Sequence, residues 1–187
     1  MAKKAVLFLT TGFEEAEALV TADVLRRGGV DVTTASLTNE TIVAGSHDIA
    51  VKADALFETI ENVWFDAVIL PGGPGTSRYM EHKSLPAYIK KAALCDNVLL
   101  AAICAAPSVL GGLGLLNGKR ATCFPGYEGK LTGAVVTGAA AEEDGRIITG
   151  KSAGCVFDFA LTVLAYLQGK ETSENVKSAM YYKTAAV

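Results

Sequence analysis

Histidine, closely spaced cysteines and long apolar runs are all scarce in this chain. Its 187 residues include two histidines and four cysteines, and no two cysteines form a C-x-x-C pair. Zinc sites and disulfide frameworks need closely spaced cysteine or histidine residues, so the sequence predicts no metal site and no disulfide scaffold. No apolar run reaches the roughly 18 residues of a membrane-spanning helix, and we therefore expect no membrane association.

An excess of positive charge is also missing. The net charge is -3, which leaves no basic surface for nucleic acid and no polybasic membrane anchor. Half of the residues are hydrophobic and 20% are charged, as in a compact folded protein. We expect a single domain over residues 1–187. The N-terminus is a poor signal peptide, and the widely spaced cysteines suit a reducing cytoplasm, so a cytoplasmic location is predicted.

The sequence does contain a regular alternation of short apolar strands and helices. The main expected strands are Ala5–Thr10, Val30–Ser36, Ala67–Leu70, Val98–Ile103 and Arg146–Thr149, and the main expected helices are Glu14–Arg27, Leu85–Leu94, Ser152–Leu167 and Ser173–Met180. This alternation predicts an α/β fold, in which helices cover both faces of a mostly parallel central sheet. Ligands bind such folds at the carboxyl ends of the strands, so the loops Thr10–Glu17, Pro71–Thr76 and Cys104–Pro107 are expected to share one site.

Cys104 stands at the junction between a strongly apolar strand and a helix. The run Val98–Ile103 reads as a buried parallel strand, and Pro107 suits the first turn of a helix. Small neighbours allow a sharp turn, which matches a nucleophile elbow, and the N-terminus of the following helix would favour a thiolate. A small, inert core cysteine is the alternative that this stretch alone leaves open.

The first predicted helix carries three acidic residues in one turn. Glu14 and Glu15 read as surface acids that complement the helix dipole. Glu17 shares a partly apolar stripe with Val20 and Val24. A carboxyl group that faces the core has a raised pKa and can act as a general acid, but from the pattern alone all three acids could equally be solvated.

A glycine pair follows the strand Ala67–Leu70. Gly72 and Gly73 permit backbone conformations that other residues avoid, and their N–H groups could bind an oxyanion together with that of Ala105. No G-x-x-x-x-G-K-[ST] phosphate loop is present. An ordinary tight loop is the other interpretation of this stretch.

Three motifs together resemble one family. They are G-F-E-E-A-E at Gly12–Glu17, I-L-P-G-G at Ile69–Gly73 and A-A-I-C-A-A-P at Ala101–Pro107, in this order. With them, essentially the whole chain resembles the ThiJ/PfpI superfamily, and within it the DJ-1 and YajL-like branch. The resemblance implies a flavodoxin-like three-layer sandwich, usually assembled as a homodimer.

The same resemblance implies a set of roles for the candidate residues. Cys104 would be the nucleophile, Glu17 the carboxyl group that hydrogen bonds to its thiolate, and the N–H groups of Gly73 and Ala105 the oxyanion pocket. The implied activity is that of a cofactor-free glyoxalase on methylglyoxal-type aldehydes, or of a deglycase on glycated amino acids and proteins. The alternative is a non-enzymatic oxidative-stress sensor or chaperone, in which Cys104 is oxidised to a sulfinate.

Several positions depart from the family pattern. Phe124 stands where many members have a histidine, so a Cys-His pair is not expected, and peptidase or amidase activity becomes a third, weaker option. His47 stands where close relatives have an arginine contributed across the dimer, and Arg27 is a second candidate for anion binding from a partner. A histidine attracts an anion only when protonated. Cys123 and Cys155 read as core cysteines or, alternatively, as resolving thiols.

Overall fold

A seven-stranded sheet forms the centre of the protein in this computed structural model, which describes residues 2–183. Its strand order is β10-β11-β7-β6-β1-β2-β5, and every pair is parallel except β10 with β11. The strands are β1 (Lys4–Leu9), β2 (Asp31–Ser36), β5 (Ala55–Leu56), β6 (Ala67–Leu70), β7 (Leu99–Ile103), β10 (Ala141–Asp144) and β11 (Ile147–Gly150). The predicted mostly parallel sheet is therefore confirmed.

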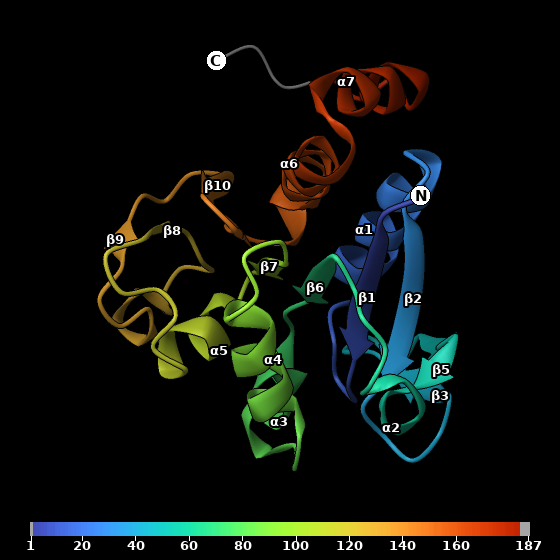
Figure 1. The fold of residues 1–187 in the computed structure, drawn as a ribbon, viewed down its shortest axis with the longest axis vertical. Helices are drawn as coiled ribbons and strands as arrows, with labels where there is room; N and C mark the ends of the chain where they lie inside the picture. Colours follow the sequence, from blue (N-terminus) through green and yellow to red (C-terminus); the bar gives the residue numbers. More distant parts are fainter. Residues whose placement is uncertain (1, 184–187) are drawn as a thin grey trace.

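Helices cover both faces of the sheet (Figure 1). One face packs against α1 (Glu15–Arg27), α6 (Val156–Gln168) and α7 (Lys170–Ala179). The other packs against α2 (Phe57–Ile60), α3 (Ser77–Glu81), α4 (Leu85–Ala93) and α5 (Pro107–Gly112). Alternate residues of β1 enter the two apolar layers, as the twofold side-chain repeat of a strand requires. Within residues 2–183 no helix is long and apolar enough to cross a membrane.

Two small sheets lie beside the main one. A hairpin around Gly45 is formed by β3 (Ile42–Ala44) and β4 (Ala50–Lys52), and a parallel pair is formed by β8 (Arg120–Ala121) and β9 (Val135–Val136). The hairpin lies against the loop before α1, because the N–H of Gly12 donates to the carbonyl of Ala44 at 2.9 Å. This contact braces the first loop of the candidate site.

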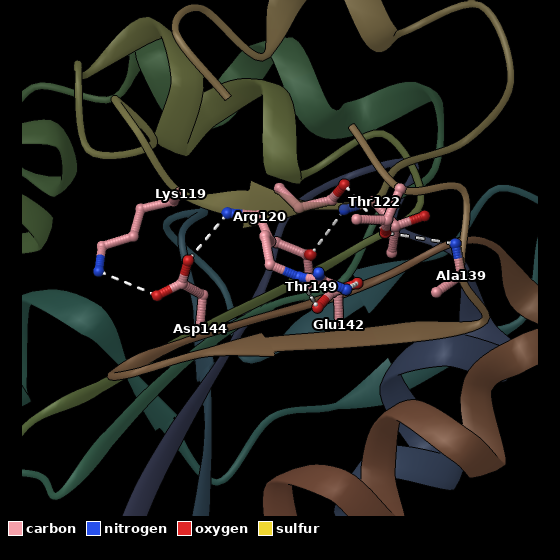
Figure 2. A network of polar contacts seen from close by, with 9 residues as sticks. Lys119, Arg120, Thr122, Ala139, Glu142, Asp144 and Thr149 are labelled. Carbon is pink, nitrogen blue, oxygen red and sulfur yellow. Dashed lines mark hydrogen bonds and ion pairs between the residues drawn. The ribbon is translucent and has the colours of Figure 1, made fainter. Parts of the chain in front are cut away.

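A polar network fastens β8 to the edge of the main sheet (Figure 2). The Arg120 guanidinium donates to both carboxylate oxygens of Glu142 at 2.9 and 3.3 Å, and the Arg120 N–H donates to Asp144 at 2.9 Å. Deeper in the same region, the N–H of Thr122 donates to the hydroxyl of Thr149 at 2.9 Å. The network thereby fixes the segment that leads from β8 toward Phe124.

Candidate active site

Cys104 occupies the turn between β7 and α5, as predicted. Its φ of 64° is left-handed, a conformation that side-chain-bearing residues rarely adopt and that is costly outside glycine. The Cys104 N–H donates to the carbonyl of Gly150 at 2.9 Å, and the Cys104 carbonyl accepts from the N–H of Phe124 at 2.8 Å. These bonds hold a half-buried thiol in the strained position of a nucleophile elbow.

Glu17 is fully buried in α1, so the interpretation of this residue as a solvated acid is wrong. Its side chain is 0% exposed, and Oε2 accepts a 2.7 Å hydrogen bond from the N–H of Gly72. Oε1 makes no hydrogen bond of standard geometry within the described residues, and the Cys104 thiol interacts with this carboxyl group. Burial raises the pKa of Glu17 to about 7, although the bonds from Gly72 and Cys104 lower it.

The carboxylate of Glu17 opposes ionisation of the Cys104 thiol. While Glu17 is ionised, burial and the negative charge of Glu17 raise the pKa of Cys104 to about 12, although hydrogen bonds from the N–H groups of Gly73 and Ala105 lower it. The low-pKa thiolate expected from the sequence is thus not available while Glu17 is charged. When Glu17 holds the shared proton, its charge disappears and its O–H can donate to a thiolate.

The two glycines after β6 have different tasks. A Cβ on Gly72 would lie 2.6 Å from the Cβ of Cys104 and 2.9 Å from Oε2 of Glu17, so only glycine fits between these side chains. The Gly72 N–H is committed to Glu17 and is not free to bind an oxyanion, which corrects the expectation for this residue. Gly73 has a φ of +99°, and its N–H, like that of Ala105, acts on the sulfur.

Glu15 and His47 form an ion pair that the sequence did not predict. Glu15 was expected on the surface but is 4% exposed, and it accepts from the N–H of His47 at 2.7 Å and contacts the His47 ring at 2.9 Å. Burial alone would raise the pKa of Glu15, but hydrogen bonds from His47 and Ser46 outweigh it and lower the pKa to about 2. Glu15 in turn raises the pKa of the exposed His47.

Glu14 completes a group that has the composition of a metal site. One ligand atom each of Glu14, Glu15 and His47 lies within 4.8 Å of the others. The hydroxyl of Ser46 also contacts both carboxylates, at 3.1 and 3.0 Å. These hydrogen bonds already satisfy the buried Glu15, so the arrangement is explained without an ion.

The remaining candidates lie apart from the sulfur or on the rim. Arg27 ends α1, ten helical residues and about 15 Å beyond Glu17, and pairs with Asp23 at 2.7 Å. Within one chain it therefore does not join Cys104. Phe124 contacts Cys104 through its backbone, and its side chain is exposed. Cys123 is buried and Cys155 half-buried, and all four cysteines are free thiols.

The chain is similar to known proteins over most of its length. The model of the DJ-1/PfpI family matches residues 3–166. Drosophila melanogaster protein dj-1beta is 36% identical over 182 residues, which cover 96% of this chain and 97% of that protein. Arabidopsis thaliana DJ-1 homolog B is 40% identical over 181 residues, which cover 95% of this chain but only 41% of the plant protein. A Caenorhabditis elegans relative, glutathione-independent glyoxalase DJR-1.2, is 33% identical over 165 residues, or 87% of each chain.

Solved structures give the same result. A DJ-1 superfamily protein from Salmonella typhimurium superposes with a TM-score of 0.92 at 37% identity, covering 97% of this chain and 100% of that one. Toxoplasma gondii DJ-1 in an oxidised form superposes with a TM-score of 0.93 at 31% identity, covering 98% and 100%. The fold is thus flavodoxin-like, as expected.

Proposed function

Because this chain belongs to the DJ-1/PfpI family, we propose that it is a stress-response protein with cofactor-free glyoxalase or deglycase activity at Cys104. The observation that carries the proposal is the fully buried Glu17, with a pKa of about 7, beside a strained cysteine. The nematode relative named as a glutathione-independent glyoxalase supports the same reaction class. The free thiols suit work in a reducing cytoplasm.

The reaction begins when the Cys104 thiolate adds to the aldehyde carbon of an α-oxoaldehyde such as methylglyoxal. A carbon–sulfur bond forms, and the carbonyl oxygen becomes an oxyanion that the N–H groups of Gly73 and Ala105 can stabilise. Glu17 supplies the proton that turns this oxyanion into a hemithioacetal hydroxyl. The buried carboxyl group holds that proton near neutral pH because burial raises its pKa to about 7.

The remaining steps are an internal redox exchange. Once ionised, Glu17 removes the proton from the former aldehyde carbon and returns one to the neighbouring ketone carbon, through an enediol. The aldehyde carbon is oxidised to a thioester while the ketone is reduced to an alcohol, so no external oxidant or reductant is consumed. Water then hydrolyses the thioester to lactate and releases the Cys104 thiol.

The test is lactate formation from methylglyoxal in the absence of glutathione. We expect Cys104→Ser to abolish turnover and Glu17→Gln to lower kcat by about 100-fold or more, since glutamine cannot transfer a proton. Cys155→Ser is the matched control for a cysteine outside the reacting pair and is expected to keep wild-type turnover. Wild-type rates in both Cys104→Ser and Glu17→Gln would refute the proposal.

The second candidate function is redox sensing at the same cysteine. The N–H groups of Gly73 and Ala105 and the protonated Glu17 would also stabilise a sulfinate, and a structural neighbour, Toxoplasma gondii DJ-1, is an oxidised form. Intact-mass measurement after mild peroxide treatment separates the two functions. A gain of two oxygens that is lost in Cys104→Ser, without lactate formation by the wild type, favours the sensor.

We further propose that the protein works as a homodimer. The large apolar side chains Leu19 on α1, Ile42 on β3 and Ile49 before β4 are 44%, 62% and 54% exposed. The hairpin and the loop before α1 are joined by the bond from Gly12 to Ala44, so these exposed apolar side chains lie on neighbouring elements and suit burial against a second copy. In such a dimer, protonated His47 and Arg27 are the candidates for anion binding from a partner.

A further inference from the structure

One peptide unit, Pro71–Gly72, connects a buried tyrosine to the reacting pair. At its nitrogen end, the Gly72 N–H donates to Oε2 of Glu17 at 2.7 Å. At its carbonyl end, the Pro71 oxygen accepts from the hydroxyl of Tyr79 at 2.9 Å. Because a peptide unit is planar and rigid, a bond at one end fixes the direction of the group at the other end.

Tyr79 is well placed to hold this peptide. It lies in α3 and is 0% exposed, and its hydroxyl also lies 3.3 Å from the carbonyl of Phe8. A tyrosine hydroxyl has one proton, so the shorter contact, to Pro71, takes the larger share of the bond. Burial raises the pKa of Tyr79, and the hydroxyl therefore remains a donor throughout the pH range of interest.

We infer that Tyr79 is a positioning residue for the Glu17–Cys104 pair, acting through the Pro71–Gly72 peptide. A hydrogen bond to the peptide carbonyl polarises the unit and strengthens its N–H as a donor. The strengthened Gly72 N–H holds Oε2 of Glu17, which fixes the position of the carboxyl group beside the Cys104 side chain. The inference rests on the proposed function in that this pair performs the chemistry, but the contact itself can be measured without turnover.

The test isolates the carboxyl group from the other groups that act on its proton. Cys104 and Glu14 change the pKa of Glu17, and the charge of Glu17 in turn raises the pKa of Tyr79. A Cys104→Ser background removes the competing thiol. Within it, carbon-13 NMR of labelled glutamate gives the pKa of Glu17 with and without Tyr79→Phe, and the Gly72 amide proton shift reports the hydrogen bond directly.

We expect Tyr79→Phe to raise the pKa of Glu17 by about 0.5 and to move the Gly72 amide proton upfield, because the N–H becomes a weaker donor. Tyr88→Phe is the matched control: the ring of Tyr88 packs in the same apolar layer, and no bond joins its hydroxyl to this peptide within residues 2–183. Neither the pKa nor the amide shift should change in that variant.

The outcomes separate this inference from the proposed function. If Tyr79→Phe leaves the Glu17 pKa and the Gly72 shift at their control values, Tyr79 is only a core residue, whatever the protein catalyses. If both change while methylglyoxal is not turned over, the positioning role stands and the proposed activity fails. Should Tyr79→Phe not fold, site-specific replacement of Tyr79 by 3-fluorotyrosine, a stronger donor, must lower the Glu17 pKa, and an unchanged value overturns the inference.

Discussion

Glu17 is the residue on which most of the chemistry depends. Its place on an apolar stripe with Val20 and Val24 was readable from helical spacing, and the structure buries it completely. Its partner could not be read in the same way, because Gly72 lies 55 residues away and is brought close only by the sheet. A local pattern thus predicts which face a side chain occupies but not which backbone group it meets.

The raised pKa of Glu17 makes folding stability depend on pH. This carboxyl group titrates at 4.5 in the unfolded chain and at about 7 in the folded protein. The folded state binds the proton more tightly, so stability falls as pH rises between these values. Glutamine does not ionise, so the variant Glu17→Gln lacks this loss of stability. Its free energy of unfolding in urea should rise relative to that of the wild type by up to about 3 kcal/mol as the pH goes from 4 to 8. The control variant Glu58→Gln, at an exposed position, should show no such dependence on pH. If Glu17→Gln also shows none, the raised pKa of Glu17 is contradicted.

The two histidines predict opposite pH trends. Glu15 raises the pKa of His47, so the stability from their bond is fully present below about pH 6.5 and is lost as pH rises through the folded pKa. Burial lowers the pKa of His82, whose neutral ring accepts from the N–H groups of Ser84 and Leu85 at 3.3 and 3.2 Å. The stability from this ring is lost as pH falls below about 6.5.

Thermal unfolding of two alanine variants across this pH range tests both trends. His47→Ala should lower the melting temperature most below about pH 6.5, and His82→Ala should lower it most above about pH 6.5. Each variant serves as the control for the other. Equal costs at all pH values in both would show that the ring contacts do not depend on protonation.

At the scale of elements, the strand–turn–helix around Cys104 was predictable because its parts are contiguous. The apolar run, the small residues and Pro107 are local signals, and the left-handed φ follows from the tightness of the turn. Other elements could not be predicted in this way, and strand β10 is the clearest example. Its sequence, AEED, has no apolar alternation, and Glu142 is buried there because Arg120 neutralises its charge. The start of α7 was placed three residues too late, since the helix begins directly after Gly169.

The strain in the elbow predicts an unusual order of variant stabilities. Glycine tolerates a φ of 64° and alanine does not, so Cys104→Gly should be more stable than Cys104→Ala by about 1 kcal/mol in urea unfolding. Cys123, which is buried and has no positive φ, provides the control. There the alanine variant should be the more stable one. The same order at both positions would contradict a strained elbow.

At the scale of the whole molecule, the alternation of elements was sufficient to predict a parallel sheet between two helical layers. It did not determine how a second copy would bind, because exposed apolar side chains belong to no periodic pattern. The hairpin of β3 and β4 illustrates this, because the exposure of Ile42 and Ile49 is visible only in the folded chain.

The proposed dimer predicts a surface variant that becomes monomeric. Leu19→Glu combined with Ile42→Glu places two charges on the proposed interface, and sedimentation equilibrium should then give the monomer mass. Leu94→Glu is the control, since Leu94 is 84% exposed beside α4, on the other side of the sheet. A wild-type protein that sediments as a monomer would contradict the proposed dimer. An interface variant that still sediments as a dimer would contradict the proposed interface.

The central claim is that Cys104 and Glu17 share one proton and that the reactive form places it on Glu17. The most direct measurement is the ultraviolet absorbance of the thiolate as a function of pH, taken as the difference between the wild type and Cys104→Ser. The account predicts a thiolate signal from Cys104 already present near pH 7, where Glu17 is still partly protonated. A signal that is absent at neutral pH and appears only in strongly alkaline solution would show that the proton stays on sulfur and never moves to Glu17, and would contradict the account.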